Sequence, residues 1–495
     1  MSNKQHFLHD LINPKSVAIY GANNTYEKFG TMMLFRILTS GFDSSRVYPI
    51  HLRLDSVLGC KAYKNIADVP EIPDLVIIVI PSKLVIQTFK ECAEKGVKHL
   101  LIVSGGFREM ADERRNSYTE ELVEIAKKYG IRFIGPNCLG MYNAWLDPSG
   151  QKSFNMMLSD PVKRGKFSMV SHSGTIAAQL YRDAEHIGLT LGKTFSIGNE
   201  ANIDLVDFLE YFKDDDETDV IGLYIEEIKR PKRFIQLAKE ITLRKPIIAM
   251  YGGGSVAGNR AVRSHTGSMA GNKKIFDAMI KETGIIQTYY IEDFLDIVSI
   301  LSNPNFVYPQ GNRIGILTHF GGPGSMVANN AERLGLAVPE FSEEFQQKMQ
   351  KLLPPTSNCS NPVDLTFDTD IMKFYLRFPK MLMKSGEIDA IIMFGVAGFY
   401  DDANKMQEIE LSKHLELREG FDDLLKDLEK IIITPTVKIS QKYSVPIIYI
   451  NNQTLASPWS KKVRKEGGII FKFWDRPVKA LVKICEYAEY RRRHS

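Results

Sequence analysis

Short apolar runs rich in β-branched residues recur along the chain, and each is followed by a glycine or proline turn and then by a stretch of helical length. The runs in the first third of the chain are 16–20, 46–50, 74–80, 99–104 and 132–134. Helix-like stretches follow two of them, at 82–95 and 111–129. Continuous apolar strands that alternate with helices are typical of a parallel sheet covered on both faces.

This pattern restarts twice, at 166–170 and at 313–318, and each restart again joins a strand to a helix through a glycine-containing turn. The later runs are 220–225, 246–251, 390–394, 445–450 and 468–473. We therefore expect an α/β protein of three doubly wound, Rossmann/flavodoxin-like domains with mainly parallel sheets. The predicted domains are residues 1–145, 146–305 and 306–495, since prolines and glycine interrupt any regular element between 302 and 312.

Composition narrows the class of protein. The 495 residues are 44% hydrophobic and 25% charged, which is ordinary for a globular protein of several cores. The 63 lysines and arginines nearly balance 59 acidic residues, so a nucleic-acid or membrane-surface partner has no electrostatic support. The apolar run 75–80 is far too short to span a bilayer. We expect no nucleic-acid and no membrane partner.

The cysteines point to a reducing compartment. There are five, an odd number, and no two stand at CxxC spacing. A disulfide framework or a structural metal site is therefore not expected, and the N-terminus lacks an apolar signal core. We predict a cytoplasmic protein without a bound metal of its own.

The glycine turns between strands and helices are candidate anion sites. Free backbone N–H groups and the helix dipole attract phosphates and carboxylates there, although tight turns also need glycine for geometry alone. The first turn begins at Gly21 but lacks the G-x-G-x-x-G fingerprint. Arg53 stands where an acid would bind a ribose hydroxyl. A nicotinamide dehydrogenase is therefore disfavoured, and Arg53 favours a nucleotide that carries a phosphate.

His265 lies in a segment of small and hydroxyl-bearing residues, 263–271, that follows three glycines at 252–254. We expect a long loop here. An imidazole on such a loop can act as a base, a metal ligand or a nucleophile, but no second histidine or cysteine stands at ligand spacing. A histidine that is merely exposed or hydrogen-bonded remains the alternative.

Two further residues are candidates for chemistry. Glu226 closes the predicted strand 220–225, at the edge of a sheet where α/β proteins bind ligands, and it could orient a histidine. A solvated strand end is the alternative reading. Cys138 could be a nucleophile, but no activating partner is visible in the sequence.

Seven motifs in this order resemble the NDP-forming acyl-CoA synthetase superfamily over nearly the whole chain. The nearest group is the α subunits of ADP-forming acetate–CoA ligases, and succinyl-CoA synthetase is more distant. The motifs are Val17-Ala-Ile-Tyr-Gly-Ala22, Val47-Tyr-Pro49, Gly135-Pro-Asn-Cys-Leu-Gly140, Ser196-Ile-Gly-Asn-Glu200, Ser264-His-Thr-Gly-Ser268, Gly321-Gly-Pro-Gly324 and Asn361-Pro-Val-Asp-Leu365.

The resemblance implies a CoA-binding first domain and two ligase domains. It implies that His265 is transiently phosphorylated and that Glu226 is its partner. Two helix N-termini would hold the phosphoryl group, and they correspond to Ser173, Gly174 and Thr175 and to Gly322, Pro323 and Gly324. CoA would lie against Gly21, Asn23, Lys28, Arg53, Pro81, Ser104, Gly105 and Asn137.

The resemblance also implies a reaction and a partner. Acyl-CoA, ADP and phosphate would interconvert with carboxylic acid, CoA and ATP through acyl phosphate and phosphohistidine. No ATP-grasp domain is visible in the chain, so ATP/ADP and Mg²⁺ are expected on a separate β subunit of a hetero-oligomer. The alternative is a non-catalytic regulatory protein that binds CoA or acyl-CoA and kept the fold.

Two residues depart from the family pattern. His172 stands where relatives usually carry glutamine or arginine, and His319 stands where asparagine is common. Both flank the phosphate turns. They are candidates for changed acyl specificity or phosphate affinity.

Overall fold

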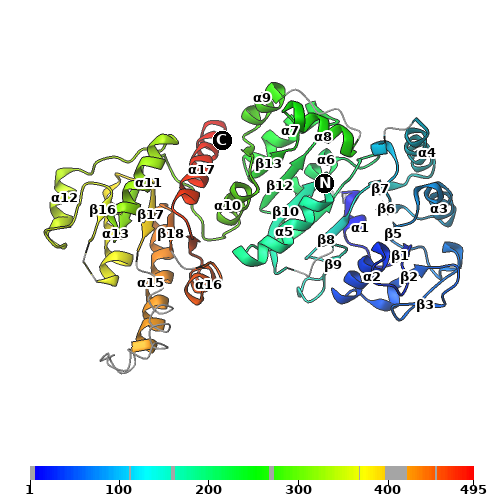
Figure 1. Cartoon of the computed structure of the whole chain (residues 1–495), viewed down its shortest axis with the longest axis horizontal. Coiled ribbons are helices and arrows are strands. Elements are labelled where there is room, and N and C mark those ends of the chain that lie inside the picture. Colours follow the sequence, from blue (N-terminus) through cyan, green and yellow to red (C-terminus); the bar gives the residue numbers. More distant parts are fainter. Residues whose placement is uncertain are drawn as a thin grey trace, which may run out of the picture. The chain divides into compact units, whose positions relative to one another are not determined.

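The computed structural model describes the chain in several stretches, which are 6–110, 113–157, 162–266, 273–366, 368, 370–395, 421–451 and 454–495 (Figure 1). The chain forms two compact units. Unit 1 comprises Met1–Glu185 and Leu189–Tyr289, and unit 2 comprises His186–Gly188 and Tyr290–Ser495. Each unit is described by itself.

Unit 1 begins with a five-stranded sheet whose pairs are all parallel. Its order is β2-β1-β5-β6-β7. The strands are β1 (Val17–Tyr20), β2 (Val47–Ile50), β5 (Leu75–Ile78), β6 (His99–Ile102) and β7 (Arg132–Ile134). The helices are α1 (Leu8–Ile12), α2 (Phe29–Thr39), α3 (Ser82–Lys95) and α4 (Glu113–Tyr129), and a small hairpin, β3 (Ser56–Val57) and β4 (Cys60–Lys61), follows β2.

Successive side chains of each strand point to opposite faces of this sheet, and both faces are buried. Val17 and Ile19 of β1 belong to the apolar core that includes Leu34 of α2. Their neighbour Ala18 belongs to a second core that includes Phe89 of α3 and Leu122 of α4. This two-sided burial explains why the strands read as uninterrupted apolar runs.

The second sheet of unit 1 has seven strands in the order β14-β13-β12-β10-β11-β8-β9. They are β8 (Gly140–Asn143), β9 (Phe154–Asn155), β10 (Arg164–Ser171), β11 (Leu191–Ser196), β12 (Val220–Ile225), β13 (Ile247–Tyr251) and β14 (Ile286–Thr288). Only the edge strands β8 and β9 pair antiparallel. The helices are α5 (Gly174–Ile187), α6 (Leu205–Lys213), α7 (Pro231–Thr242), α8 (Val256–Thr266) and α9 (Lys273–Thr283).

One continuous core joins the two sheets of unit 1. Met141 of β8 and Phe154 of β9 are fully buried in the same cluster as Ile77 of the first sheet and Phe195 of the second. At the same junction the buried amide of Asn143 donates to the carbonyl of Ile12 at 3.1 Å. These contacts hold the two sheets as one body, so that side chains from both can line one site.

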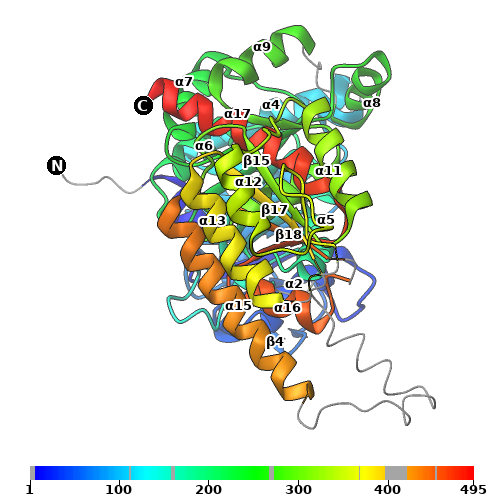
Figure 2. The same cartoon turned by 90° about the vertical axis from the view of Figure 1, so that its left-hand side faces the viewer.

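Unit 2 contains the third parallel sheet, in the order β16-β15-β17-β18-β19. Its strands are β15 (Ile314–Thr318), β16 (Val363–Asp364), β17 (Ala390–Phe394), β18 (Ile447–Ile450) and β19 (Ile469–Phe471). Its helices are α10 (Ile291–Leu301), α11 (Gly321–Arg333), α12 (Glu343–Gln350), α13 (Phe378–Ser385), α15 (Phe421–Tyr443), α16 (Pro458–Lys465) and α17 (Asp475–His494). Figure 2 shows α13 and α15 side by side in front of this sheet.

The α/β class with mainly parallel sheets is confirmed, and each apolar run named from the sequence is a strand. The division at 145 and 305 stays a prediction. The long loop expected around 252–271 is wrong, because helix α8 occupies Val256–Thr266. Ser255 favours this helix by accepting the amide of Gly258 at its first turn, at 2.9 Å. Within the described stretches, no helix is both long and apolar enough to cross a membrane.

A buried lysine in the second sheet generates a stability prediction. Lys193 of β11 is fully buried, and its ammonium group lies 2.7 Å from Asp215 and 2.6 Å from Glu217. We expect Lys193→Met to lower the free energy of unfolding by about 3–5 kcal/mol, because it leaves a buried carboxylate uncompensated. Denaturant unfolding of the full chain measures this.

Lys166→Met is the matched control, because Lys166 pairs with Asp219 at 3.5 Å and both side chains are about half exposed. Its cost is expected to stay below about 1 kcal/mol. Equal effects of the two substitutions would contradict the role given to the buried pair.

Candidate active site

All three sheets share one winding pattern, and it places the three glycine turns at equivalent positions. In each parallel set the first strand is flanked by the second on one side and the third on the other. The crevice at the carboxyl ends of the first and third strands is where such sheets bind ligands. The turns after β1, β10 and β15, which begin at Gly21, His172 and His319, lie at these switch points.

A cavity of about 620 Å³ lies in unit 1 where two of these edges meet. The first sheet contributes the residues that follow β5, β6 and β7, and the second contributes the turn from β10 into α5. The predicted site residues that line it are Pro81, Ser104, Gly105, Asn137, Gly174 and Thr175. Segments far apart in sequence therefore meet at one cavity.

The other residues predicted to bind CoA do not line this cavity. Gly21 has a φ of +89°, and a Cβ there would stand 1.9 Å from the carbonyl oxygen of Val79, so only glycine fits. The amide oxygen of Asn23 accepts the backbone N–H of Thr25 at 2.7 Å and thus shapes the turn itself. Lys28 and Arg53 are exposed, with their charges in solvent.

The wall formed by the first sheet is held by hydrogen bonds. The hydroxyl of Ser104 donates to the carbonyl of Ile80 at 2.6 Å and accepts its amide at 3.1 Å. Asn137 has a positive φ of 59°, and its side-chain amide donates to that of Asn199 at 3.3 Å. These hydrogen bonds hold the two polar side chains of the wall in place.

Cys138 lies in the same wall and is not suited to nucleophilic work. Its thiol donates to the carbonyl of Ile102 at 3.2 Å. Burial raises the pKa of this thiol to about 12, so the reactive thiolate is scarce near neutral pH.

The β10–α5 turn presents the start of a helix to the cavity. Ser173 is buried, and its hydroxyl accepts the amide of Ile176 at 3.4 Å, so it acts within the turn. Gly174 lies tightly against the first sheet's wall, because a Cβ there would stand 2.7 Å from the Cβ of Leu139. The absence of a side chain lets α5 begin directly at the cavity.

His172 precedes this turn and lines the same cavity. Its Nε2 atom lies 3.1 Å from the carboxylate of Glu200, and its Nδ1 atom lies 3.0 Å from the carbonyl oxygen of Tyr224. Burial lowers the pKa of His172, but attraction and hydrogen bonding by Glu200 outweigh it, and the net pKa is raised. Sequence reasoning noted His172 but missed Glu200, whose signal was its place just after the strand that ends at Ser196.

Glu226 is buried just beyond β12, 2% exposed. Burial and a hydrogen bond from the Tyr224 hydroxyl to the Glu226 carboxylate raise the pKa of Tyr224. The amide of Glu226 also lies 3.4 Å from Nδ1 of His172. Glu226 is therefore not a solvated strand end. Its described contacts are with Tyr224 and His172.

His265 lies in the last turn of α8, near the C-terminal end of that helix. Its side chain is outside the described residues, so the pairing with Glu226 stays a prediction.

The third glycine turn belongs to unit 2. Helix α11 begins at Gly321, so Gly322, Pro323 and Gly324 form its first turn. His319 is buried, its ring centroid lies 4.0 Å from that of Phe374, and burial lowers its pKa. His319 is thus a neutral, packed ring near neutral pH.

Comparison with known proteins shows the family to which this chain belongs. The CoA binding domain model matches residues 15–144, and the succinyl-CoA ligase like flavodoxin domain model matches residues 164–301. The chain is 37% identical, over 77% of its length and 80% of the relative's, to the α subunit of acetate–CoA ligase (ADP-forming) II from Pyrococcus furiosus. The chain therefore belongs to the family of ADP-forming acyl-CoA synthetases.

Two further relatives extend the comparison. The acetate–CoA ligase (ADP-forming) of Methanocaldococcus jannaschii is 37% identical over 72% of this chain, which spans 48% of that protein. The acetyl-coenzyme A synthetase 1 of Ca. Korarchaeum cryptofilum, solved with phosphate and ADP, superposes with a TM-score of 0.79 at 27% identity. That match covers 98% of this chain and 97% of the other.

The close packing of Gly174 against Leu139 leads to a stability prediction, for which Gly322 is the control. Gly174→Ala is expected to cost about 1–3 kcal/mol of stability and to shift the start of α5, because the new methyl group collides with Leu139. Gly322→Ala has nothing within 4 Å of its Cβ, so it should leave stability unchanged or slightly raised. Thermal unfolding of the two variants, run side by side, distinguishes them, and an unaffected Gly174→Ala would refute the packing.

Proposed function

We propose that this chain is the α subunit of an ADP-forming acyl-CoA synthetase. It interconverts acyl-CoA, ADP and phosphate with a carboxylic acid, CoA and ATP. The observation that carries the proposal is the cavity shared by the CoA-binding sheet and the β10–α5 turn, with Glu226 buried beside it. A thioester bound against the first sheet would reach a helix N-terminus suited to phosphate.

The proposed reaction has three steps. A phosphate oxygen attacks the thioester carbonyl carbon, the carbon–sulfur bond breaks, and CoA leaves as a thiolate that takes a proton. A nitrogen of the His265 imidazole then attacks the phosphorus of the acyl phosphate, and the carboxylate leaves. The phosphoryl group finally passes to ADP, which yields ATP and restores the histidine.

Each proposed residue has a physical task. Glu226 keeps the far nitrogen of His265 protonated and so stabilises the charged phosphohistidine. The N-termini at Ser173–Thr175 and Gly322–Gly324 supply dipoles for the phosphoryl oxygens. Pro81, Ser104, Gly105 and Asn137 form the wall for the CoA arm, and Lys28 and Arg53 offer exposed cations for its phosphates.

ADP, ATP and Mg²⁺ are proposed to bind a separate ATP-grasp β subunit. In support, some relatives are named as α subunits, and this chain spans only 48% of the acetate–CoA ligase (ADP-forming) of Methanocaldococcus jannaschii, which favours a division of the reaction between two parts.

Phosphorylation of His265 is the decisive test. The full chain is mixed with a candidate ATP-grasp partner and labelled ATP, and an acid-labile, base-stable phosphoprotein is expected. His265→Ala should abolish the label. His494→Ala, at the exposed C-terminal end of α17, should retain it. A label that survives His265→Ala would refute the mechanism, and CoA binding without any label would favour the non-catalytic regulator.

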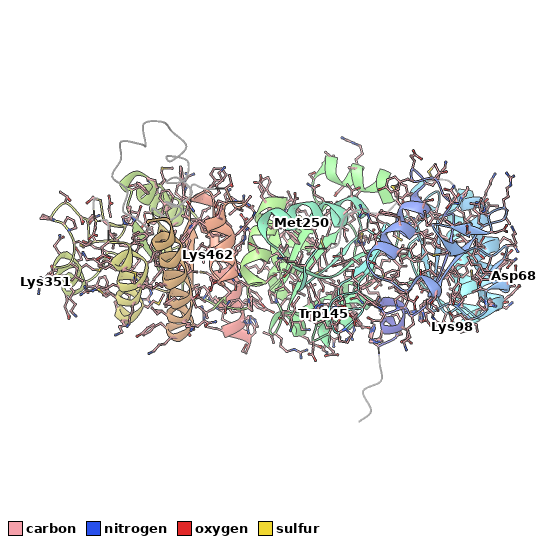
Figure 3. The ribbon with its side chains drawn as sticks, turned by 90° about the horizontal axis from the view of Figure 1, so that it is seen from below. Asp68, Lys98, Trp145, Met250, Lys351 and Lys462 are labelled. Atoms are coloured by element: carbon pink, nitrogen blue, oxygen red, sulfur yellow. The ribbon has the colours of Figure 1, made fainter. Side chains whose placement is uncertain are left out.

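The CoA assignment has its own test. Arg53→Glu is expected to weaken CoA binding severalfold at low salt and less at high salt, because it reverses an exposed charge. Lys98→Glu makes the same charge change at an exposed lysine (labelled in Figure 3) that directly precedes β6, at the amino-terminal end of that strand, and should leave affinity unchanged. Calorimetric titration with CoA measures both, and equal affinities would remove Arg53 from the site.

A further inference from the structure

A chain of three charged side chains, two of them buried, lies next to the cavity of unit 1. His172 is 5% exposed and Glu200 is 3% exposed, and they pair at 3.1 Å. On the far side of Glu200, the ammonium group of Lys229 lies 3.9 Å from the same carboxylate and donates to the carbonyl of Asn199 at 2.9 Å. Of these three charged side chains only His172 lines the cavity.

Both ring nitrogens of His172 face acceptors. Nε2 faces the Glu200 carboxylate, and Nδ1 faces the Tyr224 carbonyl at 3.0 Å, which is closer than the Glu226 amide at 3.4 Å. An imidazolium carries an N–H on both nitrogens, so it suits a ring whose two nitrogens both lie beside acceptors. The groups that face it are the carboxylates of Glu200 and Glu226, and both favour the charged form.

The position of Glu200 is itself fixed. Its carboxylate accepts the amide of Leu205 at the start of α6, at 2.7 Å, and its backbone has a φ of +49°. The positive end of a helix dipole attracts a carboxylate held at the helix N-terminus. The pair is therefore oriented, with its negative member in the protein and its positive member at the cavity.

The positive end of the pair adjoins a second source of positive potential. Gly174 and Thr175, at the N-terminus of the 14-residue helix α5, line the same part of the cavity as His172. Fixed positive charge next to a helix N-terminus adds to the attraction for an anion. A neutral glutamine at position 172 would supply no such charge.

We propose that His172 is a phosphate-positioning residue. Its imidazolium, clamped between Glu200 and the Tyr224 carbonyl, places a positive charge beside the α5 N-terminus, where the attacking phosphate binds. Because Nδ1 faces the Tyr224 carbonyl and Nε2 lies against the Glu200 carboxylate, the ring acts through its charge rather than through a hydrogen bond to the substrate. This inference rests on the proposed function and adds a residue to it.

The charge on His172 predicts a pH dependence of known sign. The pKa of His172 is raised, so the ring is charged at neutral pH and loses its charge only as the pH rises through that raised pKa. Phosphate affinity should therefore fall at alkaline pH. Glu200→Gln removes the carboxylate that raises the pKa, so the fall should begin at a lower pH.

The experiment measures the KM for phosphate in the labelling of the full chain from acyl-CoA and labelled inorganic phosphate, with the partner subunit present, at mildly acid to alkaline pH. His172→Gln should raise the KM for phosphate about tenfold at neutral pH. The KM for phosphate of this variant should no longer rise at alkaline pH as that of wild type does, and its KM for acyl-CoA should be nearly unchanged. Glu217→Gln, which removes a carboxylate beside Lys193, is the matched control and should leave the pH profile unchanged.

The outcomes separate the two proposals. If wild type takes no label, the proposed function is wrong, and the role of His172 falls with it. If wild type is labelled but His172→Gln has the same KM for phosphate, or Glu200→Gln does not shift the alkaline fall, only the role of His172 is refuted. Should His172→Gln fail to fold with Glu200 unpaired, the double variant His172→Gln/Glu200→Gln removes both charges and gives the same comparison.

Discussion

The order in which parallel strands are wound is the constraint on which this molecule depends. When the first strand lies between the second and the third, the helices that follow the first and second strands must cover opposite faces, and a crevice stays open at the carboxyl ends. All three sheets adopt this order. A turn such as 171–174 is therefore placed at a crevice before any of its side chains is considered.

That constraint also explains which buried charges meet. Strands β10 and β12 are parallel neighbours, with Ser171 in register with Tyr224. One residue beyond the paired strands, His172 must lie beside the peptide that leads to Glu226. The loop after β11, the other neighbour of β10, brings Glu200 to the same edge. The cost of burying His172 and Glu200 is offset because the two side chains pair at 3.1 Å.

The strands and the turns that follow them could be predicted from the sequence. Strands buried on both faces appear as apolar runs, and glycine turns appear as breaks between these runs. Glu226 could be placed at a sheet edge for the same reason. The helix over Val256–Thr266 was missed because glycine and asparagine disfavour helices locally, while the cap from Ser255 operates only in three dimensions. The His172–Glu200 pair was missed because no periodic pattern links residues in different loops.

The small net charge of the chain is compatible with anion binding at a few local sites. A protein that handles phosphates by general attraction would need a broadly basic surface, which would also attract nucleic acid and acidic membranes. Here 63 basic residues nearly balance 59 acidic ones. The attraction for anions is instead concentrated at helix starts and at one buried imidazolium, whose counter-ion Glu200 lies behind it. A carboxylate placed behind the cation keeps the cation charged without occupying the cavity, so the site attracts an anion while the rest of the surface stays nearly neutral.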